Sequence, residues 1–492
     1  MKQTVKNMIF FLSDEHSKSH LGCYGSEHVH TPHLDQLAQA GTVFEAAYCN
    51  SPICVPSRAS LATGRYVHDI RFWDNGTPYD GTASSWAHIL KENGFDVVSI
   101  GKLHYRGDDE DDNGFTEEII PLHTINGVGD LLGLIREDMS PNKAAGNFAS
   151  KLGPGQSNYT DYDLNIAMAA QKWLIDREAS ENAKPFALFV SMVSPHFPLI
   201  SPQKFFDQYD LDSVPMPRLS FPAEWPKHPV IDEYRRIYNY NDYFDEDRTR
   251  LAVANYFGLC SYLDDLIGKV IGTIKATGFE DESYILYASD HGENLGTRGL
   301  WGKSVMYEES VAVPMIIAGP NIPAAKRSNT PVSLVDVFAT VMDIFDLSPD
   351  DDIARPGKSL CKIASAKSDD PSRPIYSEYH ASGSLTGHLM VRIGKWKYIH
   401  YPGYAPQLFD LEHDVLENND LGESLEHEDI RDQCEAALRK IVDIEAVNML
   451  AFADQKVRIE QFGGVDQIRA RGSYGYSPPP GETTEFIMEP KI

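Results

Sequence analysis

The feature that most constrains the fold is a series of short apolar runs that each stop at a cluster of polar residues. Such a run, apolar throughout, is typical of a parallel strand buried on both faces. In open parallel sheets, ligands bind outside the carboxyl ends of the strands, so these polar clusters are expected to meet at one site. The four runs are residues 8–13 before Asp14, 95–100 before Gly-Lys-Leu-His at 101–104, 185–193 before Ser-Pro-His at 194–196, and 283–288 before Ser-Asp-His at 289–291.

Segments with helical character separate these strands, at residues 33–40, 84–92, 162–175, 248–277 and 333–345, and a further strand is predicted at 314–318. This alternation predicts an α/β fold with a large, mostly parallel sheet sandwiched by helices. After about residue 365, short alternating segments at 374–379, 389–393, 395–401 and 407–411 precede a helix near 430–450. They predict a smaller C-terminal α+β subdomain that carries an antiparallel sheet.

We therefore expect three parts: the α/β domain at residues 1–365, the antiparallel-sheet and helix subdomain at 366–450, and a C-terminal arm at 451–492. The arm contains the irregular segment GSYGYSPPPGE, residues 472–482. Such a segment either packs on a neighbouring subunit or stays loose. The first possibility predicts a homodimer or a homotetramer.

Composition excludes several classes of partner. The formal net charge of −28 repels nucleic acid and anionic lipid. No apolar stretch approaches the roughly 20 residues of a membrane-spanning helix, so no membrane association is expected. The apolar part of the N-terminus, residues 8–12, is too short for a signal peptide, and the six cysteines form no CxxC pair. Reduced thiols and a cytoplasmic location are the corresponding expectations.

A lone cysteine begins a predicted helix in the stretch CVPSRASLATGR, residues 54–65. Pro56 suits the first turn of a helix, and Gly64 suits its C-cap. The helix N-terminus directs free N–H groups toward Cys54, and Arg58 adds a planar cation suited to an oxyanion. Taken alone, Cys54 is interpreted equally well as a packing residue or as a reactive thiolate.

The stretch resembles the signature of the type I, formylglycine-dependent sulfatases of the alkaline phosphatase superfamily. The resemblance implies that a formylglycine-generating enzyme oxidises Cys54, and that the hydrated aldehyde provides the nucleophile. Val55 and Ala62 depart from the commonest residues of the signature. Further segments are similar to the family in the same order: FLSDEHSKSHLGCYG with HTPHLDQLAQAG, NGFDVVSIGKLH, ASDHGENLGTRGLWGKSVMYEESVAVPMII and QLFDLEHDVLENNDL.

The resemblance also implies one divalent metal ion, with Asp14, Asp290, His291 and the modified Cys54 as ligands. Oxygen ligands with one imidazole suit Ca²⁺ first, and Mn²⁺ or Mg²⁺ as alternatives. The Asp-His pair resembles the choline-sulfatase, arylsulfatase and phosphonate monoester hydrolase branch of the superfamily. Whether Glu15 is a further ligand stays open at this point.

Two residues of the segment Gly-Lys-Leu-His are implied to act on the sulfate. Lys102 would contact the sulfate, and His104 would remove a proton from the second hydroxyl of the sulfated intermediate, which expels sulfate and regenerates the aldehyde. With Arg58 and Lys303, Lys102 would form a positive cup in an otherwise acidic protein. Catalysis would then depend on charge stabilisation around a transferring SO₃ group.

The leaving-group side is implied to contain His196 and Lys303, which match a histidine and lysine pair of the family. Both would also bind the substrate. Asn75, in the sequence WDNG, would contact the anion, although an Asn-Gly turn explains this residue almost as well.

The expected function is hydrolysis of sulfate monoesters to an alcohol or phenol and inorganic sulfate. The first alternative is a phosphonate monoester or phosphodiester hydrolase with the same site. The resemblance implies that such enzymes have neutral residues at the positions of Lys102 and His104, which favours a sulfate monoester. The second is a non-catalytic binding protein on this scaffold. Aryl, alkyl, choline and sugar sulfates all stay open as substrates. A choline site needs aromatic faces, and four aromatic residues lie near the site segments: Trp73, Trp301, Tyr105 and Tyr307.

Overall fold

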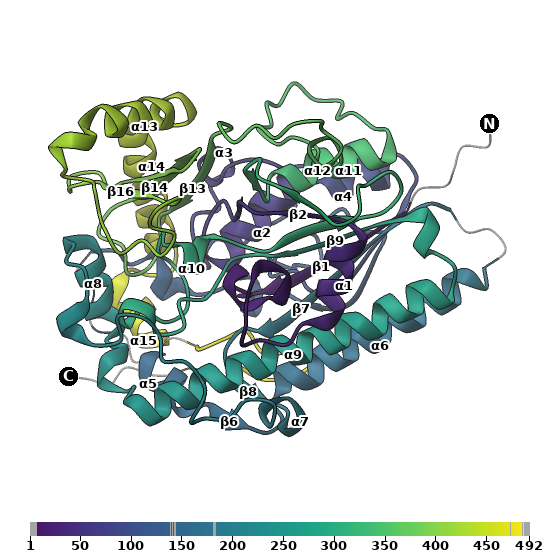
Figure 1. Cartoon of the computed structure of the whole chain (residues 1–492), viewed down its shortest axis with the longest axis horizontal. Helices are drawn as coiled ribbons and strands as arrows, with labels where there is room; N and C mark the ends of the chain where they lie inside the picture. The colour runs from purple at the N-terminus through teal and green to yellow at the C-terminus, as the bar shows by residue number, and fades with distance from the viewer. Residues whose placement is uncertain are drawn as a thin grey trace.

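An eight-stranded sheet forms the centre of the computed structural model, which describes residues 7–137, 139, 141, 144–180, 184–472, 474–484 and 486 (Figure 1). In sheet order, the five strands from β5 (Glu117–Leu122) to β9 (Ser283–Ser289) run parallel, whereas β10 (Met315–Ala318) runs antiparallel to both of its neighbours. The prediction of a large, mostly parallel sheet is therefore confirmed. The strand order is β11 (Lys326–Ser328), β2 (Thr42–Phe44), β10 (Met315–Ala318), β9 (Ser283–Ser289), β1 (Asn7–Asp14), β7 (Phe186–Pro195), β4 (Asp96–Lys102) and β5 (Glu117–Leu122).

Helices cover both faces of this sheet, as Figure 1 shows for α6 and α9 on one side and α4 and α11 on the other. Phe10 and Leu12 of β1 pack with helices of the first face, and Ile9 and Phe11 pack with helices of the second. Successive side chains of a strand point to opposite faces, so two covered faces require an apolar run without alternation. The first face has α2 (Cys54–Thr63), α4 (Trp86–Glu92) and α11 (Asp336–Phe345), and the second has α1 (Pro32–Ala40), α6 (Asn158–Glu178) and α9 (Glu246–Ala276).

A four-stranded antiparallel sheet follows in the C-terminal part, with strands β13 (Ile375–Tyr379), β14 (His388–Ile393), β15 (Trp396–His400) and β16 (Gln407–Asp410) in chain order. This predicted sheet is also confirmed. The helix expected near 430–450 is two helices, α13 (Glu428–Ile441) and α14 (Ile444–Gln461), because the extended Val442 ends the first and Asp443 caps the second. The boundary expected at residue 450 therefore falls inside α14, and α15 (Val465–Arg471) follows.

Shorter elements connect these layers. Among the described residues, no helix is both long enough and apolar enough to cross a membrane. None of the six cysteines, all of which lie in the described part of the chain, forms a disulfide bond. The short helices are α3 (Val67–Ile70), α5 (Ala144–Ser150), α7 (Gln203–Phe206), α8 (Pro229–Tyr238), α10 (Glu308–Val311) and α12 (Leu360–Ala364), and the two-stranded pairs are β3 (Ala47–Tyr48) with β12 (Val332–Ser333) and β6 (Leu152–Pro154) with β8 (Leu199–Ser201).

Candidate active site

The carboxyl ends of four adjacent parallel strands meet at one edge of the large sheet. Asp14 is the last residue of β1, and Lys102 is the last residue of β4. His196 directly follows β7, and Asp290 directly follows β9. The polar clusters that the sequence places after each strand therefore share one site, as expected for ligand binding in an open parallel sheet.

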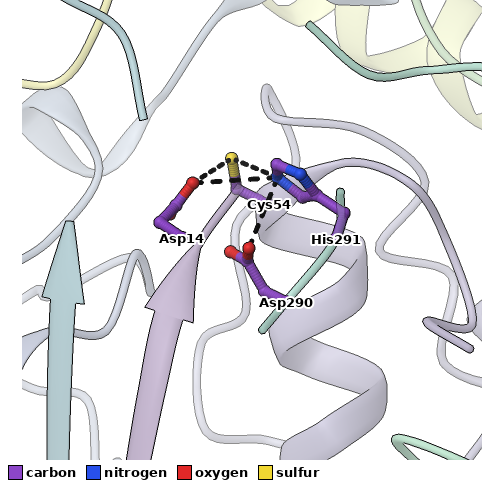
Figure 2. Close-up of side chains that lie close together, drawn as sticks. All are labelled: Asp14, Cys54, Asp290 and His291. Atoms are coloured by element: carbon purple, nitrogen blue, oxygen red, sulfur yellow. Dashed lines mark hydrogen bonds and ion pairs between the residues drawn. The ribbon is translucent and has the colours of Figure 1, made fainter. Parts of the chain in front are cut away.

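Asp14, Cys54, Asp290 and His291 form a buried centre at this edge, shown in Figure 2. One possible ligand atom of each residue lies within 4.8 Å of the other three. Cys54 Sγ lies 3.2 Å from His291 Nε2 and 3.8 Å from Asp14 Oδ1. His291 Nδ1 is 3.1 Å from the carbonyl oxygen of Gly292, which assigns the ring proton to Nδ1 and leaves the Nε2 lone pair facing the centre.

Arg58 lies behind this centre and holds the outer oxygen of each carboxylate. Its Nε is 2.8 Å from Asp290 Oδ2, and its Nη2 is 3.0 Å from Asp14 Oδ2. The inner oxygens of Asp14 and Asp290 then lie 3.8 Å and 3.5 Å from His291 Nε2. Another guanidinium nitrogen, Nη1, donates to the backbone carbonyl of Lys102. Arg58 thus orients the two acids, and it stands behind the cavity wall instead of in it.

Burial and nearby charges shift the pKa values of Asp14 and Cys54 in opposite directions. Although burial raises the pKa of Asp14, the ammonium of Lys102 at 2.5 Å and the guanidinium of Arg58 hold it well below its usual range. Burial, with the nearby charge of Asp14, raises the pKa of the Cys54 thiol to about 12. An unmodified thiol here is protonated at neutral pH and is therefore a weak nucleophile.

The donor set of the centre fits a divalent cation. Two inner carboxylate oxygens and one imidazole nitrogen converge on the same point, and Arg58 and Lys102 balance the charge of the acids behind them. Glu15 points elsewhere: its Oε2 lies 3.0 Å from Lys303 Nζ and 3.3 Å from His196 Nε2. Asp14, Glu15 and His196 also form a close group of possible ligands, so Glu15 borders the centre without joining its four-residue set.

A cavity adjoins the centre, and most of the predicted site residues lie in its wall. Asn75 lines it while its Oδ1 accepts a hydrogen bond from the backbone N–H of Val55 at 3.1 Å, which fixes this side chain at the start of α2. Asp14, Asp290, His291 and Arg58 do not line the cavity but contact one another beside Cys54. The structure therefore brings all ten predicted site residues together, with six in the wall: Cys54, Asn75, Lys102, His104, His196 and Lys303.

The outer wall of the cavity was not found from the sequence. Of the four aromatic residues considered there, Trp301 lines the cavity, whereas Trp73 binds Asp454 of α14 instead. The wall is drawn from segments that share no motif, and the tyrosine-rich tail was the one signal that could have pointed to it. The lining residues missed from the sequence include Asp130, Phe148, Tyr159, Phe197, Tyr234, Tyr238, Tyr240, Tyr474, Tyr476 and Ser477.

Comparison with known proteins supports the resemblance to the sulfatases that the sequence motifs indicate. A family model described as Sulfatase matches residues 6–347, and one described as N-sulphoglucosamine sulphohydrolase, C-terminal, matches residues 296–443. The chain is 33% identical over 416 residues to a choline-sulfatase of Rhizobium meliloti (strain 1021), which covers 81% of this chain and 79% of that protein. It is 29% identical over 463 residues to arylsulfatase K of Danio rerio, with 90% and 84% covered.

A solved structure shows the same fold. The phosphonate monoester hydrolase of Agrobacterium radiobacter superposes with a TM-score of 0.73 at 21% identity, over 88% of this chain and 95% of that one. The family model covers well over half of the chain, and the residues that meet at the strand ends all lie inside the matched range. The chain therefore belongs to the sulfatase family, and it is a sulfuric ester hydrolase of the branch of the alkaline phosphatase superfamily that includes choline-sulfatase, arylsulfatase and phosphonate monoester hydrolase.

Proposed function

We propose that the protein hydrolyses sulfate monoesters, so that the ester and one water give an alcohol or phenol, inorganic sulfate and one proton, and that Cys54 supplies the nucleophile after maturation. The observation that carries this proposal is the position of Cys54 Sγ, 3.2 Å from His291 Nε2 and inside the set of converging donors. Relatives named choline-sulfatase and arylsulfatase K support a sulfate ester as the substrate.

Two groups complete the site in this proposal. Formylglycine, made from Cys54 by a formylglycine-generating enzyme, would supply a nucleophilic hydroxyl in its hydrated form, and a divalent ion would stabilise negative charge on the sulfate. Asp14, Asp290 and His291 would hold that ion, which we propose to be Ca²⁺, with Mn²⁺ or Mg²⁺ as alternatives. The raised pKa of the Cys54 thiol supports this maturation, because the thiol itself is poorly suited to attack.

The residues of the cavity wall bind the sulfate and assist the leaving group. Lys102 and Lys303 present ammonium groups to one cavity, so both can bind sulfate oxygens. Glu15 contacts Lys303 and His196 with the same oxygen and thereby holds the two together. This pair would face the ester oxygen and deliver a proton to it as the alcohol leaves.

His104 would act as the base that accompanies release of sulfate. Burial, with the adjacent charge of Lys102, holds the pKa of His104 well below its usual range. The imidazole is therefore neutral at physiological pH and has a lone pair available for a proton. A neutral histidine beside a cation-lined sulfate pocket supports this role.

Phosphonate monoesters are a second candidate substrate class. The fold of a phosphonate monoester hydrolase matches this chain over most of its length, and the metal-ligand pair Asp290-His291 suits either ester. The cation of Lys102 at the cavity favours the sulfate monoester. In related phosphonate monoester hydrolases, we expect a neutral residue at this position.

A substrate panel with one enzyme preparation tests the proposal. It compares 4-nitrophenyl sulfate, choline sulfate, phenyl phosphonate and bis-4-nitrophenyl phosphate, with Cys54→Ala as the blank and mass spectrometry of the Cys54 peptide as the maturation check. We expect preference for a sulfate that is lost in the blank. Preference for the phosphonate or the diester by a matured enzyme would replace the first candidate by the second, and a matured enzyme that acts on none would contradict both.

A further inference from the structure

Within the C-terminal arm, residues 474–484 lie against the cavity of their own chain. Tyr474, Tyr476 and Ser477 contribute to the cavity wall. Ser477 is 4% exposed, and its hydroxyl oxygen lies 2.9 Å from His104 Nε2, although 373 residues separate the two in sequence. The arm therefore brings a polar side chain directly onto a ring that the proposed reaction uses.

Contacts on both sides of Ser477 hold this segment in place. The carbonyl oxygen of Ser477 accepts a hydrogen bond from Tyr159 Oη at 2.8 Å. The ring of Tyr476 packs edge-on against Tyr159, with 4.8 Å between the ring centroids. Further along, Glu482 Oε2 accepts a hydrogen bond from Asn158 Nδ2 at 2.7 Å. The start of α6 thus anchors the arm, and the position of the Ser477 hydroxyl follows from it.

The hydrogen bond to Ser477 bears on which ring nitrogen of His104 carries the proton. Its other ring nitrogen, Nδ1, has no hydrogen-bond partner among the described residues. A neutral imidazole has one donor nitrogen and one acceptor nitrogen. If Nε2 donates to Ser477 Oγ, the lone pair is placed on Nδ1, which is then free to take a proton. The same bond also fixes the orientation of the ring.

We propose that Ser477 is a positioning residue for His104, whose ring it holds in the tautomer and orientation needed for proton transfer. This inference rests on the proposed function, in which His104 is the base that accompanies sulfate release. Catalytic histidines commonly depend on such a third group that orients the ring. The arm then belongs to the working site and does more than close its outer wall.

Four variants test this role with 4-nitrophenyl sulfate: Ser477→Ala, Ser477→Thr, His104→Ala and the double variant Ser477→Ala/His104→Ala. We expect Ser477→Ala to lower kcat about 10-fold with KM near the wild-type value, since loss of an orienting partner has an effect of that order. Ser477→Thr retains a hydroxyl and restores most of kcat. In the His104→Ala background, Ser477→Ala causes no further loss, because its effect passes through that ring.

A second readout does not depend on rate alone. Intact mass spectrometry of enzyme quenched during turnover measures the fraction of protein that retains a sulfo group, and this fraction is expected to rise in Ser477→Ala. Melting temperatures equal to wild type show that the arm still packs. Should the melting temperature of Ser477→Ala fall, the Thr variant and the double variant still separate loss of the hydroxyl from loss of the arm.

The outcomes separate this role from the proposed function. Wild-type turnover that disappears in Cys54→Ala tests the sulfatase reaction itself. If that reaction is present but Ser477→Ala turns over at the wild-type rate or faster, the arm does not position His104. An additional loss in the double variant would place the effect of Ser477 elsewhere and overturn the inference. A matured wild type without sulfate ester turnover would overturn both proposals.

Discussion

At the scale of single residues, the proposed metal site depends on how the two acids divide their oxygens. Asp290 gives one oxygen to Arg58 and turns the other toward His291. Removing this carboxylate takes away one ligand and leaves the buried guanidinium with one fewer partner, which is costly in an interior site. The centre and its supporting arginine therefore act as one unit.

We predict that Asp290→Ala loses bound metal and turnover together. Each would fall by at least about 100-fold, because a direct ligand matters more than the orienting partners whose loss costs 10–100-fold. Metal content by mass spectrometry of digested protein and initial rates check this. Asp176→Ala, on an exposed stretch of α6, is the control and should match wild type. Full activity without retained metal would rule out the site as drawn.

His104 provides a second residue-scale prediction. Because it lines the cavity without taking part in the four-residue centre, its loss should spare the first release of alcohol and slow only the later release of sulfate. We predict that His104→Ala releases about one alcohol per active site and then slows by 100-fold or more, the order expected for loss of a general base. Rapid-mixing measurements of 4-nitrophenol show this burst. Unchanged steady-state turnover would remove His104 from the reaction.

At the scale of secondary-structure elements, α2 carries Cys54 at its start and must end sharply. Gly64 ends it with a positive φ of 67°, and its N–H donates to the carbonyl oxygen of Ser60. A Cβ added at Gly64 would lie 2.6 Å from Phe338 Cβ of α11, whereas one at Gly278, which has a similar φ of 75°, would meet nothing within 4 Å. An alanine would meet similar backbone strain at the two positions, but different packing.

We predict that Gly64→Ala destabilises the protein more than Gly278→Ala. Both substitutions cost about 1–2 kcal/mol for the left-handed backbone. Gly64→Ala adds about 1–3 kcal/mol for overpacking against Phe338. Melting temperatures of the two variants and wild type measure the difference. Equal shifts would show that Phe338 moves aside freely and that α2 does not depend on the close approach.

The strands of the large sheet differ in how well their sequences predict them, and so do the residues of the site. The strands that carry Asp14, Lys102 and Asp290 were predicted because burial on both faces leaves a continuous apolar run. The edge strands β11 and β5 and the interior strand β2 were missed, since β2 and β11 are three residues long and β5 is only partly buried. Ser477 was missed for another reason. Its contact with His104 depends on how the arm returns across the molecule, and no local pattern encodes such a path.

At the scale of the whole molecule, a buried carboxylate joins the large domain to the antiparallel sheet. Glu378 of β13 accepts hydrogen bonds from the N–H and Nδ1 of His68 in α3, at 2.9 Å and 2.8 Å. Its other oxygen lies 3.0 Å from His380 Nε2. Although burial raises the pKa of Glu378, the two imidazoles hold it well below its usual range. The carboxylate is therefore charged, and each of its oxygens has a histidine partner.

This junction should make stability depend on pH through His68. Burial lowers the pKa of His68, and so does the nearby charge of Arg65. The carboxylates of Glu378 and Asp69 raise it, and overall the pKa of His68 lies above its usual value. A folded-state pKa above the unfolded one adds stability below about pH 6.5, and this is lost as pH rises through the folded value. His380 contributes with the opposite sign, because burial lowers its pKa below the usual value.

We therefore predict that the difference in melting temperature between wild type and His68→Gln is larger at about pH 5.5 than at about pH 9. Glutamine can still donate to Glu378, so the variant removes the titratable charge while one polar contact is retained. His28→Gln, the same change on an exposed ring away from this junction, is the control. If the difference is independent of pH, His68 is neutral in the folded protein and the two sheets are joined by packing and neutral hydrogen bonds. If it grows with pH, the sign of the pKa shift at this junction is opposite to the one its geometry implies.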